Sequence, residues 1–308
     1  MRGARITGWG AALPEKVVTN EDLQSTLETN HDWIVERTGI HERRVGGSTS
    51  GLAIESARTA MEMAGWTPES VDLLILTTTS PDQQIPATAS TVQNELGLTC
   101  GAFDLNAACS GFAYALVVAH GMVDTGMSRI LVVGADTLSR FTDWEDRGTA
   151  ILFGDGAGAV ALEAVDGPGE LLAYDLGSDG SARHILDADI GGLMRMDGKE
   201  VFRRAVRVMV SSSKATLERA GLTVDDIDLV IPHQANIRIL ESACNKLGIP
   251  MEKAVSILHR TGNTSSASIP LALADAADSG RLQPGQIVLL VGFGAGMTWA
   301  SVLIRWNP

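Results

Sequence analysis

Apolar, strand-like runs alternate with helical stretches along the chain. Residues 130–135 and 287–292 contain only aliphatic residues and glycine, a pattern typical of strands buried on both faces. Residues 112–119 are rich in Ala, Leu and Val and predict a buried helix, and residues 269–277 form a second apolar helix. This alternation predicts an α/β fold.

Two parts of the chain repeat one pattern. Residues 64–75 match residues 220–231 without a gap, and each stretch predicts a helix ended by glycine, then a turn, then a buried strand. Two shorter matches follow in the same order, residues 94–98 with 245–249 and residues 153–158 with 293–296. Three matches in one order indicate a duplication.

The duplication predicts two pseudo-symmetric halves that share one core. We place them at residues 1–165 and 166–308, with the seam near residues 163–170, where Asp166-Gly167-Pro168-Gly169 is rich in turn formers. No linker long or polar enough for independent movement separates the halves.

Composition narrows the functional classes. Hydrophobic residues make up 45% of the chain and charged residues 20%, which fits a folded globular protein. No run approaches the roughly 18 apolar residues of a membrane span, and the N-terminus has no signal-peptide pattern, so we expect a cytoplasmic protein with no membrane partner. A formal net charge of −13 argues against nucleic acid, since phosphate binding needs a basic face.

The three cysteines have neither metal-ligand spacing nor the density of a disulfide framework, so we expect free thiols. Cys109 lies in Asp104–Gly111, directly before the predicted helix 112–119. The positive end of a helix dipole favours a thiolate, which predicts a lowered pKa for this thiol. The alternative is that Cys109 is a small core residue.

Two further stretches are candidates for chemistry. His233 follows the predicted buried strand 227–231, and ligands of α/β sheets gather beyond the carboxyl ends of strands. Residues 260–268 form a polar loop of small residues before the helix 269–277. The alternatives are a structural histidine and a helix N-cap region, respectively, although Asn263 equally suits an amide directed into a site.

Four segments, residues 104–111, 232–236, 262–267 and 293–299, together resemble β-ketoacyl-acyl carrier protein synthase III, a condensing enzyme of the thiolase-like superfamily. The likeness runs from Ile6 to Trp306 without a large gap. It implies a thiolase-like five-layer α-β-α-β-α fold, a homodimer, and decarboxylative condensation of a short acyl-CoA with malonyl-acyl carrier protein, without metal or cofactor.

The resemblance assigns a catalytic triad to Cys109, His233 and Asn263. It implies that Cys109 takes the acyl group from coenzyme A, and that His233 and Asn263 donate hydrogen bonds to the enolate oxygen formed when malonyl thioester loses CO₂. The backbone N–H groups of Cys109 and Ala295 would form a second oxyanion hole, and Phe293 would favour decarboxylation beside the malonyl carboxylate.

Binding residues are implied in the same way. The expected coenzyme A residues are Thr29, Trp33, Arg37, Arg147 and Asn236. The expected carrier-docking cations are Arg203, Arg207, Arg238 and Lys246, and the expected acyl-pocket residues are Ile85, Met194 and Met196. Ile85 is smaller than an aromatic residue, which suggests that the site accepts a longer or branched primer.

Three other functions stay open at this point. A hydroxymethylglutaryl-CoA synthase or a specialised condensing enzyme of secondary metabolism shares the Cys-His core, and Asn263 in Gly-Asn-Thr-Ser favours decarboxylative condensation over the former. A catalytically silent subunit is expected to lose the nucleophile, which this chain keeps. A Cys-His-Asn hydrolase is disfavoured by the duplicated halves.

Overall fold

Five strands form the first sheet of the computed structural model, which describes residues 2–308. Their order is β1 (Arg2–Ala12), β7 (Asp155–Asp166), β6 (Arg129–Thr137), β4 (Leu73–Thr77) and β5 (Gly101–Leu105). The first two pairings along this order are antiparallel and the last two are parallel.

Four strands form the second sheet. Their order is β8 (Leu171–Ser178), β13 (Thr298–Arg305), β12 (Ile287–Gly294) and β11 (Leu229–Pro232). Two antiparallel pairings are again followed by a parallel one. In the second sheet, an isolated parallel bridge between Val230 and Ala254 takes the position that the β4–β5 pairing has in the first sheet. The two sheets therefore have the same topology.

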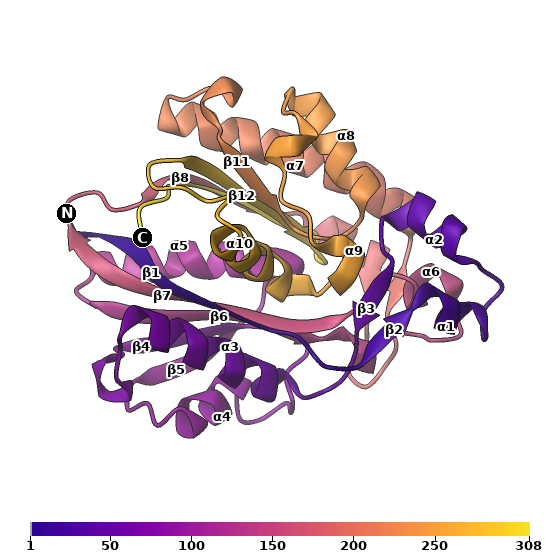
Figure 1. The fold of residues 1–308 in the computed structure, drawn as a ribbon, viewed down its shortest axis with the longest axis horizontal. Coiled ribbons are helices and arrows are strands. Elements are labelled where there is room, and N and C mark those ends of the chain that lie inside the picture. Colours follow the sequence, from indigo (N-terminus) through magenta and orange to yellow (C-terminus); the bar gives the residue numbers. More distant parts are fainter. Residues whose placement is uncertain (1) are drawn as a thin grey trace.

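Helices form the other three layers (Figure 1). The central pair, α5 (Gly111–Asp124) and α10 (Ser268–Asp278), packs between the sheets. The outer pairs are α3 (Thr49–Ala64) and α4 (Thr88–Glu95) on the first sheet, and α7 (Gly198–Ala220) and α8 (Ile237–Leu247) on the second. This arrangement confirms the predicted five-layer α-β-α-β-α fold.

The repeated sequence pattern corresponds to repeated local structure. Gly65 and Gly221, at φ 67° and 65°, end α3 and α7 in the left-handed conformation that glycine adopts without strain. A 3₁₀ turn and a buried strand follow each glycine, as predicted. Strand β7 continues to Asp166, so the break between the sheets is narrower than the predicted seam. The division into halves at residue 165 stays a prediction.

Short elements surround the carboxyl ends of the central strands, at the right of Figure 1. They are β2 (Val17–Thr19), α1 (Asn20–Gln24), α2 (His31–Thr38), β3 (Glu42–Arg44), α6 (Arg147–Ala150), β9 (Leu186–Asp187), β10 (Arg195–Met196) and α9 (Leu258–Thr261). Across residues 2–308, no helix combines the length and apolarity that crossing a membrane requires.

Candidate active site

Cys109 lies in the 3₁₀ turn η2 (Ala108–Ser110) that connects β5 to α5. The placement before the first turn of a buried helix is as predicted. The residue is 9% exposed. Ala108 has a φ of 49°, which a non-glycine residue rarely adopts. The strained turn presents the sulfur at the junction of the two sheets.

The predicted low pKa of Cys109 is wrong. Burial raises the pKa of the thiol to about 12, and the charge of Asp136 adds to that rise. The nearby Ser265 side chain acts in the opposite direction and lowers this pKa. Desolvation of a charged sulfur therefore outweighs the favourable end of α5. The resting group is a neutral thiol, and deprotonation has to accompany the reaction.

His233 follows β11 directly, and its backbone N–H donates to the carbonyl of Val291 at 2.8 Å. Its Nδ1 lies 2.6 Å from the hydroxyl of Ser268, which also accepts the backbone N–H of Gln234 at 3.3 Å. Among residues 2–308 this hydroxyl has no other acceptor for its proton, so donation to Nδ1 satisfies both groups. The network thus assigns the imidazole proton to Nε2. Burial lowers the pKa of His233 to about 3, so the ring is a neutral donor.

Asn263 is held on both sides by backbone hydrogen bonds. Its N–H donates to Leu152 at 2.8 Å and its carbonyl accepts from Gly154 at 2.9 Å. Its side-chain Oδ1 accepts the N–H of Ser265 at 2.9 Å. The amide orientation is fixed by that bond, so the Nδ2 donors are left for the cavity.

The loop that follows Asn263 is not an N-cap region, so that alternative is wrong. The N-cap of α10 is Ala267, which has no side chain able to cap. The serines bond elsewhere, because Ser268 contacts His233 and Ser266 donates to Asp136 at 2.7 Å. Asp136 also accepts hydrogen bonds from residues 78–80, so its buried carboxylate joins the loop of the second sheet to the first.

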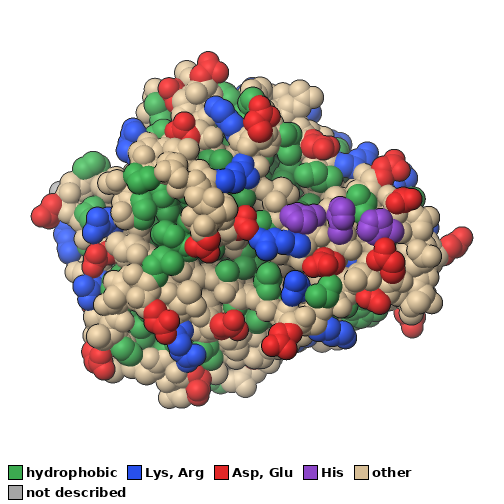
Figure 2. All heavy atoms as spheres, viewed as in Figure 1, with side chains coloured by type: hydrophobic (Ala, Val, Ile, Leu, Met, Phe, Trp, Pro, Cys, Tyr) green, Lys and Arg blue, Asp and Glu red, His purple; other side chains and the backbone are tan. Residues whose placement is uncertain are grey.

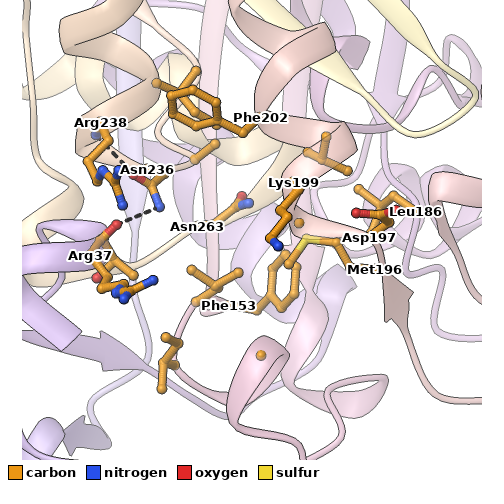
Figure 3. Close-up of a pocket in the computed structure, with 18 of the residues that line it drawn as sticks. Arg37, Phe153, Leu186, Met196, Asp197, Lys199, Phe202, Asn236, Arg238 and Asn263 are labelled. Atoms are coloured by element: carbon orange, nitrogen blue, oxygen red, sulfur yellow. Dashed lines mark hydrogen bonds between the residues drawn. The ribbon is translucent and has the colours of Figure 1, made fainter. Parts of the chain in front are cut away.

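A cavity of about 860 Å³ brings the three predicted catalytic residues together. It runs from exposed side chains at its mouth to the buried Cys109, His233 and Asn263. Figure 3 shows Asn263 among the residues that line it. Phe293 lies edge-on to His233, with ring centroids 5.4 Å apart. An apolar ring therefore lies beside the imidazole in this cavity.

The mouth of this first cavity is basic. Its lining includes Arg37, Arg147, Lys199 and Arg238. None of these four takes part in an ion pair among residues 2–308. A chain of net charge −13 therefore places four cations without ion pairs around one opening, against the single lining carboxylate of Asp197. Such an arrangement attracts a polyanionic ligand.

Trp33 lies at the centre of the expected coenzyme A residues. The guanidinium of Arg37 is 5.0 Å from its ring centroid and that of Arg147 is 4.7 Å away. A base sandwiched between Trp33 and Arg147 needs about 7 Å, twice a van der Waals contact. Arg147, which donates to the Glu28 carbonyl at 2.9 Å, therefore has to move before a base enters.

Two other expected coenzyme A residues are less available. Asn236 lines the cavity, but its amide caps α8 and donates to the Arg37 carbonyl at 3.0 Å (Figure 3). Thr29 does not line the cavity; its buried hydroxyl, among residues 2–308, has no hydrogen-bond partner.

A second cavity of about 880 Å³ also opens on Cys109. Leu138, Phe141, Phe153 and Met194 contribute its apolar surface. The sulfur therefore lies between two cavities, which suits a residue that receives an acyl group from one side and stores its chain on the other.

The predicted acyl-pocket residues do not share one cavity. Met194 lines the second cavity, but Met196 lines the first. The reason is local: Met196 pairs with Leu186 across β9 and β10, whereas the backbone of Met194 bonds to Phe141 on the other side. Ile85 is 83% exposed and lines neither cavity, although the neighbouring Gln84 lines the second.

Gly294 packs directly against the nucleophile turn. A Cβ at this position would lie 2.6 Å from the backbone nitrogen of Cys109, so only glycine allows this approach. Ala295, the expected second oxyanion donor, follows Gly294 and lines the second cavity beside Cys109. The two predicted backbone donors therefore belong to segments in contact.

The expected docking cations lie on two adjacent helices. Arg203 and Arg207 belong to α7 and Arg238 and Lys246 to α8, and the helices pack together. Arg203 is not free, because it forms a two-bond ion pair with Glu200 at 2.6 and 2.9 Å. On the face shown in Figure 2, acidic and basic side chains are interspersed. Any acidic partner has to select the α7 and α8 cations locally.

Sequence reasoning missed three site residues. Ser265 and Ser268 lie in the loop 260–268, for which a helix N-cap region was the alternative interpretation, and no local pattern distinguishes a serine that contacts His233 from one that caps a helix. Lys199 lines the first cavity from the first turn of α7. The sequence feature that could have indicated Lys199 is the Asp197-Gly198-Lys199 stretch, a polar and flexible start to a long amphipathic helix.

Comparisons with known proteins agree with this geometry. A family model described as 3-oxoacyl-[acyl-carrier-protein (ACP)] synthase III matches residues 103–180, and the model of its C-terminal part matches residues 217–306. The β-ketoacyl-[acyl-carrier-protein] synthase III of Erythrobacter litoralis is 50% identical, over 98% of this chain and 99% of the relative.

Solved structures give the same result. The 3-oxoacyl-[acyl-carrier-protein] synthase III of Aquifex aeolicus superposes with a TM-score of 0.97 at 43% identity, covering 99% of this chain and 100% of that one. The priming β-ketosynthase of the R1128 polyketide pathway superposes with a TM-score of 0.93 at 36% identity, covering 100% and 97%.

Proposed function

The chain belongs to the β-ketoacyl-[acyl-carrier-protein] synthase III family, and from this premise we propose that it condenses a short acyl-CoA primer with malonyl-acyl carrier protein. The products are β-ketoacyl-carrier protein, coenzyme A and CO₂. The reaction starts fatty acid synthesis, and a role in secondary metabolism is not favoured. The observation that carries the proposal is a nucleophile shared by two cavities and faced by two neutral donors.

In the first half-reaction, the sulfur of Cys109 attacks the primer thioester. A bond forms between the sulfur and the acyl carbon, the bond to coenzyme A breaks, and the thiol proton leaves with coenzyme A. The backbone N–H groups of Cys109 and Ala295 are the proposed donors to the tetrahedral oxyanion. The acyl chain then occupies the second cavity, where Met194 is a proposed contact.

In the second half-reaction, malonyl thioester enters by the first cavity and loses CO₂. The electron pair of the broken bond delocalises onto the thioester oxygen. Nε2–H of His233 and Nδ2–H of Asn263 donate to that oxygen, and Phe293 disfavours the charged carboxylate. Carbon then attacks the acyl group, Cys109 leaves as thiolate, and the thiolate takes a proton from solvent.

The excess of cations at the mouth, four against the carboxylate of Asp197, supports the two substrate assignments. Coenzyme A and the phosphopantetheine arm of a carrier both bring phosphate to the same opening, and arginine pairs well with phosphate. We assign the coenzyme A base to Trp33 with Arg147 displaced, and the phosphates to Arg37. Asn236 and Thr29 are weaker candidates, because one is engaged and the other lies off the cavity.

The test is direct product analysis. The purified protein is mixed with acetyl-CoA and malonyl-carrier protein, and the carrier is weighed by mass spectrometry. We expect β-ketoacyl-carrier and one CO₂ for each coenzyme A released. Hydrolysis of either thioester without a new carbon–carbon bond would contradict the proposal.

We propose that the carrier protein docks on Arg207, Arg238 and Lys246. The contribution of Arg203 to docking is smaller, because its guanidinium is bonded to Glu200. Reversing charge at Arg207, which lies outside both cavities, is expected to raise KM for malonyl-carrier roughly fivefold to tenfold. Acylation from acyl-CoA should not change, because the acyl donor does not touch this position. Steady-state kinetics of each half-reaction measures both.

Arg58→Glu is the matched control for Arg207→Glu. Arg58 is equally exposed and lies on α3, in the outer layer on the opposite side of the molecule (Figure 1). The same change of charge there should leave KM for malonyl-carrier unaltered. An equal rise in both variants would mean that total charge matters and that α7 is not the docking surface.

Primer size is proposed to depend on Ile85, which the family resemblance places at a partner subunit's primer site in a homodimer. Its 83% exposure in the single chain is compatible with that position. We expect isobutyryl-CoA to compete well with acetyl-CoA, and Ile85→Phe to shift the ratio of kcat/KM toward acetyl-CoA roughly tenfold. An unchanged ratio would remove Ile85 from the pocket. The control is Met63→Phe, an exposed site on α3 that lines neither cavity.

The remaining assignments follow from the reaction. Decarboxylation supplies the carbanion, so we propose that neither a metal nor a cofactor takes part. We also propose that the enzyme is a cytoplasmic acyltransferase, because its two substrates are products of intracellular metabolism.

A further inference from the structure

The loop opposite Cys109 contains a serine in a strained backbone conformation. Ser265 has a φ of 52°, and with Ala108 it is one of two non-glycine residues in residues 2–308 with positive φ. The two residues belong to the turns η7 (Ser265–Ala267) and η2, which pack against each other. Strain of this kind persists where the surrounding structure imposes it, and it concentrates at functional sites.

The hydroxyl of Ser265 is also unsatisfied. The residue is 1% exposed, and within residues 2–308 its Oγ makes no hydrogen bond of good geometry. A buried hydroxyl without a partner is costly. The other serines of the loop are engaged: Ser266 bonds to Asp136 and Ser268 contacts His233.

The backbone of Ser265 is held by the catalytic loop itself. The backbone N–H of Ser265 donates to Oδ1 of Asn263 at 2.9 Å, which fixes the turn. The side chain lines the second cavity together with Cys109 and Ala295. The nearness of the Ser265 side chain lowers the pKa of Cys109, against the effect of burial. The hydroxyl therefore lies on the acyl-chain side of the sulfur, opposite the side from which His233 and Asn263 act.

We propose that Ser265 is a catalytic residue whose hydroxyl donates a hydrogen bond to the sulfur of Cys109 whenever that sulfur is negatively charged. This inference rests on the proposed role of Cys109 as nucleophile. The donor acts when the thiolate attacks the primer and again when it leaves the condensation intermediate. Ser265 keeps its proton throughout; the thiol proton leaves with coenzyme A and is replaced from solvent.

The geometry explains how one buried sulfur serves both half-reactions. His233 and Asn263 are reserved for the enolate oxygen, and their neutral donors approach from the first cavity. A thiolate in the same dry region needs a donor of its own, since burial strongly disfavours its charge. Ser265 supplies that donor without adding a charge that would interact with the malonyl carboxylate.

The test measures the thiolate directly. Ser265→Ala removes the hydroxyl, and Cys109 is alkylated with iodoacetamide at several pH values, with the modified peptide quantified by mass spectrometry. Below the pKa of the thiol the rate follows the thiolate fraction. We expect a rate roughly threefold to tenfold lower than wild type at each pH, because a donor to a charged group is lost while intrinsic nucleophilicity rises slightly.

Thr264→Val is the matched control. Thr264 is the neighbouring residue, its hydroxyl is likewise buried without a partner among the described residues, and it lines neither cavity. We expect wild-type alkylation from this variant. Ser265→Gly is the second test variant, because glycine accepts a φ of 52° and removes the hydroxyl without strain. It should show the same reduction as Ser265→Ala.

The kinetic readout separates this role from a structural one. Acylation by acetyl-CoA should fall in Ser265→Ala in proportion to alkylation, while decarboxylation of malonyl-carrier should be unchanged. Wild-type alkylation rates in both Ser265 variants, or an equal loss in Thr264→Val, would overturn the inference. If wild-type protein is alkylated at Cys109 but not acylated by acyl-CoA, the proposed function fails while the alkylation result still decides the role of Ser265.

Discussion

Cys109→Ala is expected to abolish condensation, with a loss of roughly 10⁴-fold or more in kcat/KM for acyl-CoA. Among residues 2–308, Cys109 is the only nucleophilic residue that lines both cavities, so no neighbouring side chain can replace it. Decarboxylation of malonyl-carrier should continue, because His233 and Asn263 remain. Coenzyme A release and CO₂ release, measured separately, test the two halves of this prediction.

Cys100→Ser is the control for that loss. Cys100 is a half-buried thiol just before β5, lines neither cavity and also has a raised pKa through burial. Its replacement should leave both half-reactions intact. Condensation by the Cys109 variant at even a hundredth of the wild-type rate would show that another residue carries the acyl group.

Asn263→Asp is expected to lower malonyl decarboxylation by roughly 10²- to 10³-fold, the effect of losing one oxyanion donor. An aspartate keeps the oxygen that accepts the N–H of Ser265, so the loop stays in place. It loses the Nδ2 donors and presents a negative charge to the enolate oxygen. Acylation of Cys109 by acetyl-CoA should change far less, because that step uses backbone donors.

The pH dependence of decarboxylation tests the partner donor. Burial lowers the pKa of His233 to about 3, so the ring is protonated only below that value and keeps one N–H donor above it. Measured in Cys109→Ala, the rate should therefore be level from about pH 5 to about pH 9. A limb with a midpoint near 6.5, the ordinary value for histidine, would contradict a buried neutral imidazole.

The fold was readable from the sequence because its signals are local. Glycines 65 and 221 end helices in the left-handed conformation, and each is followed by a turn and an apolar strand, so the repeat reports the same structure twice. Runs such as 287–292 contain no polar residue, so they are expected to form strands of a sheet that is buried on both faces.

The electrostatics of the site were not readable. The sequence places Cys109 at a helix N-terminus, which favours a thiolate, but the cost of burial depends on how tightly Phe153, Gly294 and the serine loop enclose the sulfur. Those segments are more than forty residues away in the chain. The tautomer of His233 likewise depends on Ser268, which is 35 residues away in the chain.

The binding residues were partly readable. Trp33 and Arg37 share a helix face, so their proximity follows from spacing alone, and the structure has the pair stacked. Met194 and Met196 show the limit of such reasoning, because a two-residue strand divides them between two cavities. Glu200 likewise forms an ion pair with Arg203, which their spacing on the helix permits but does not require.

The central claim is that one sulfur receives the primer and passes it to the malonyl-derived carbon. The most direct measurement is the mass of the peptide containing Cys109, first after acetyl-CoA alone and then after malonyl-carrier is added. We predict one acetyl group on Cys109, followed by its complete loss with one CO₂ released per group. An acetyl group on another residue, or one that stays on Cys109 while CO₂ is released, would contradict the account.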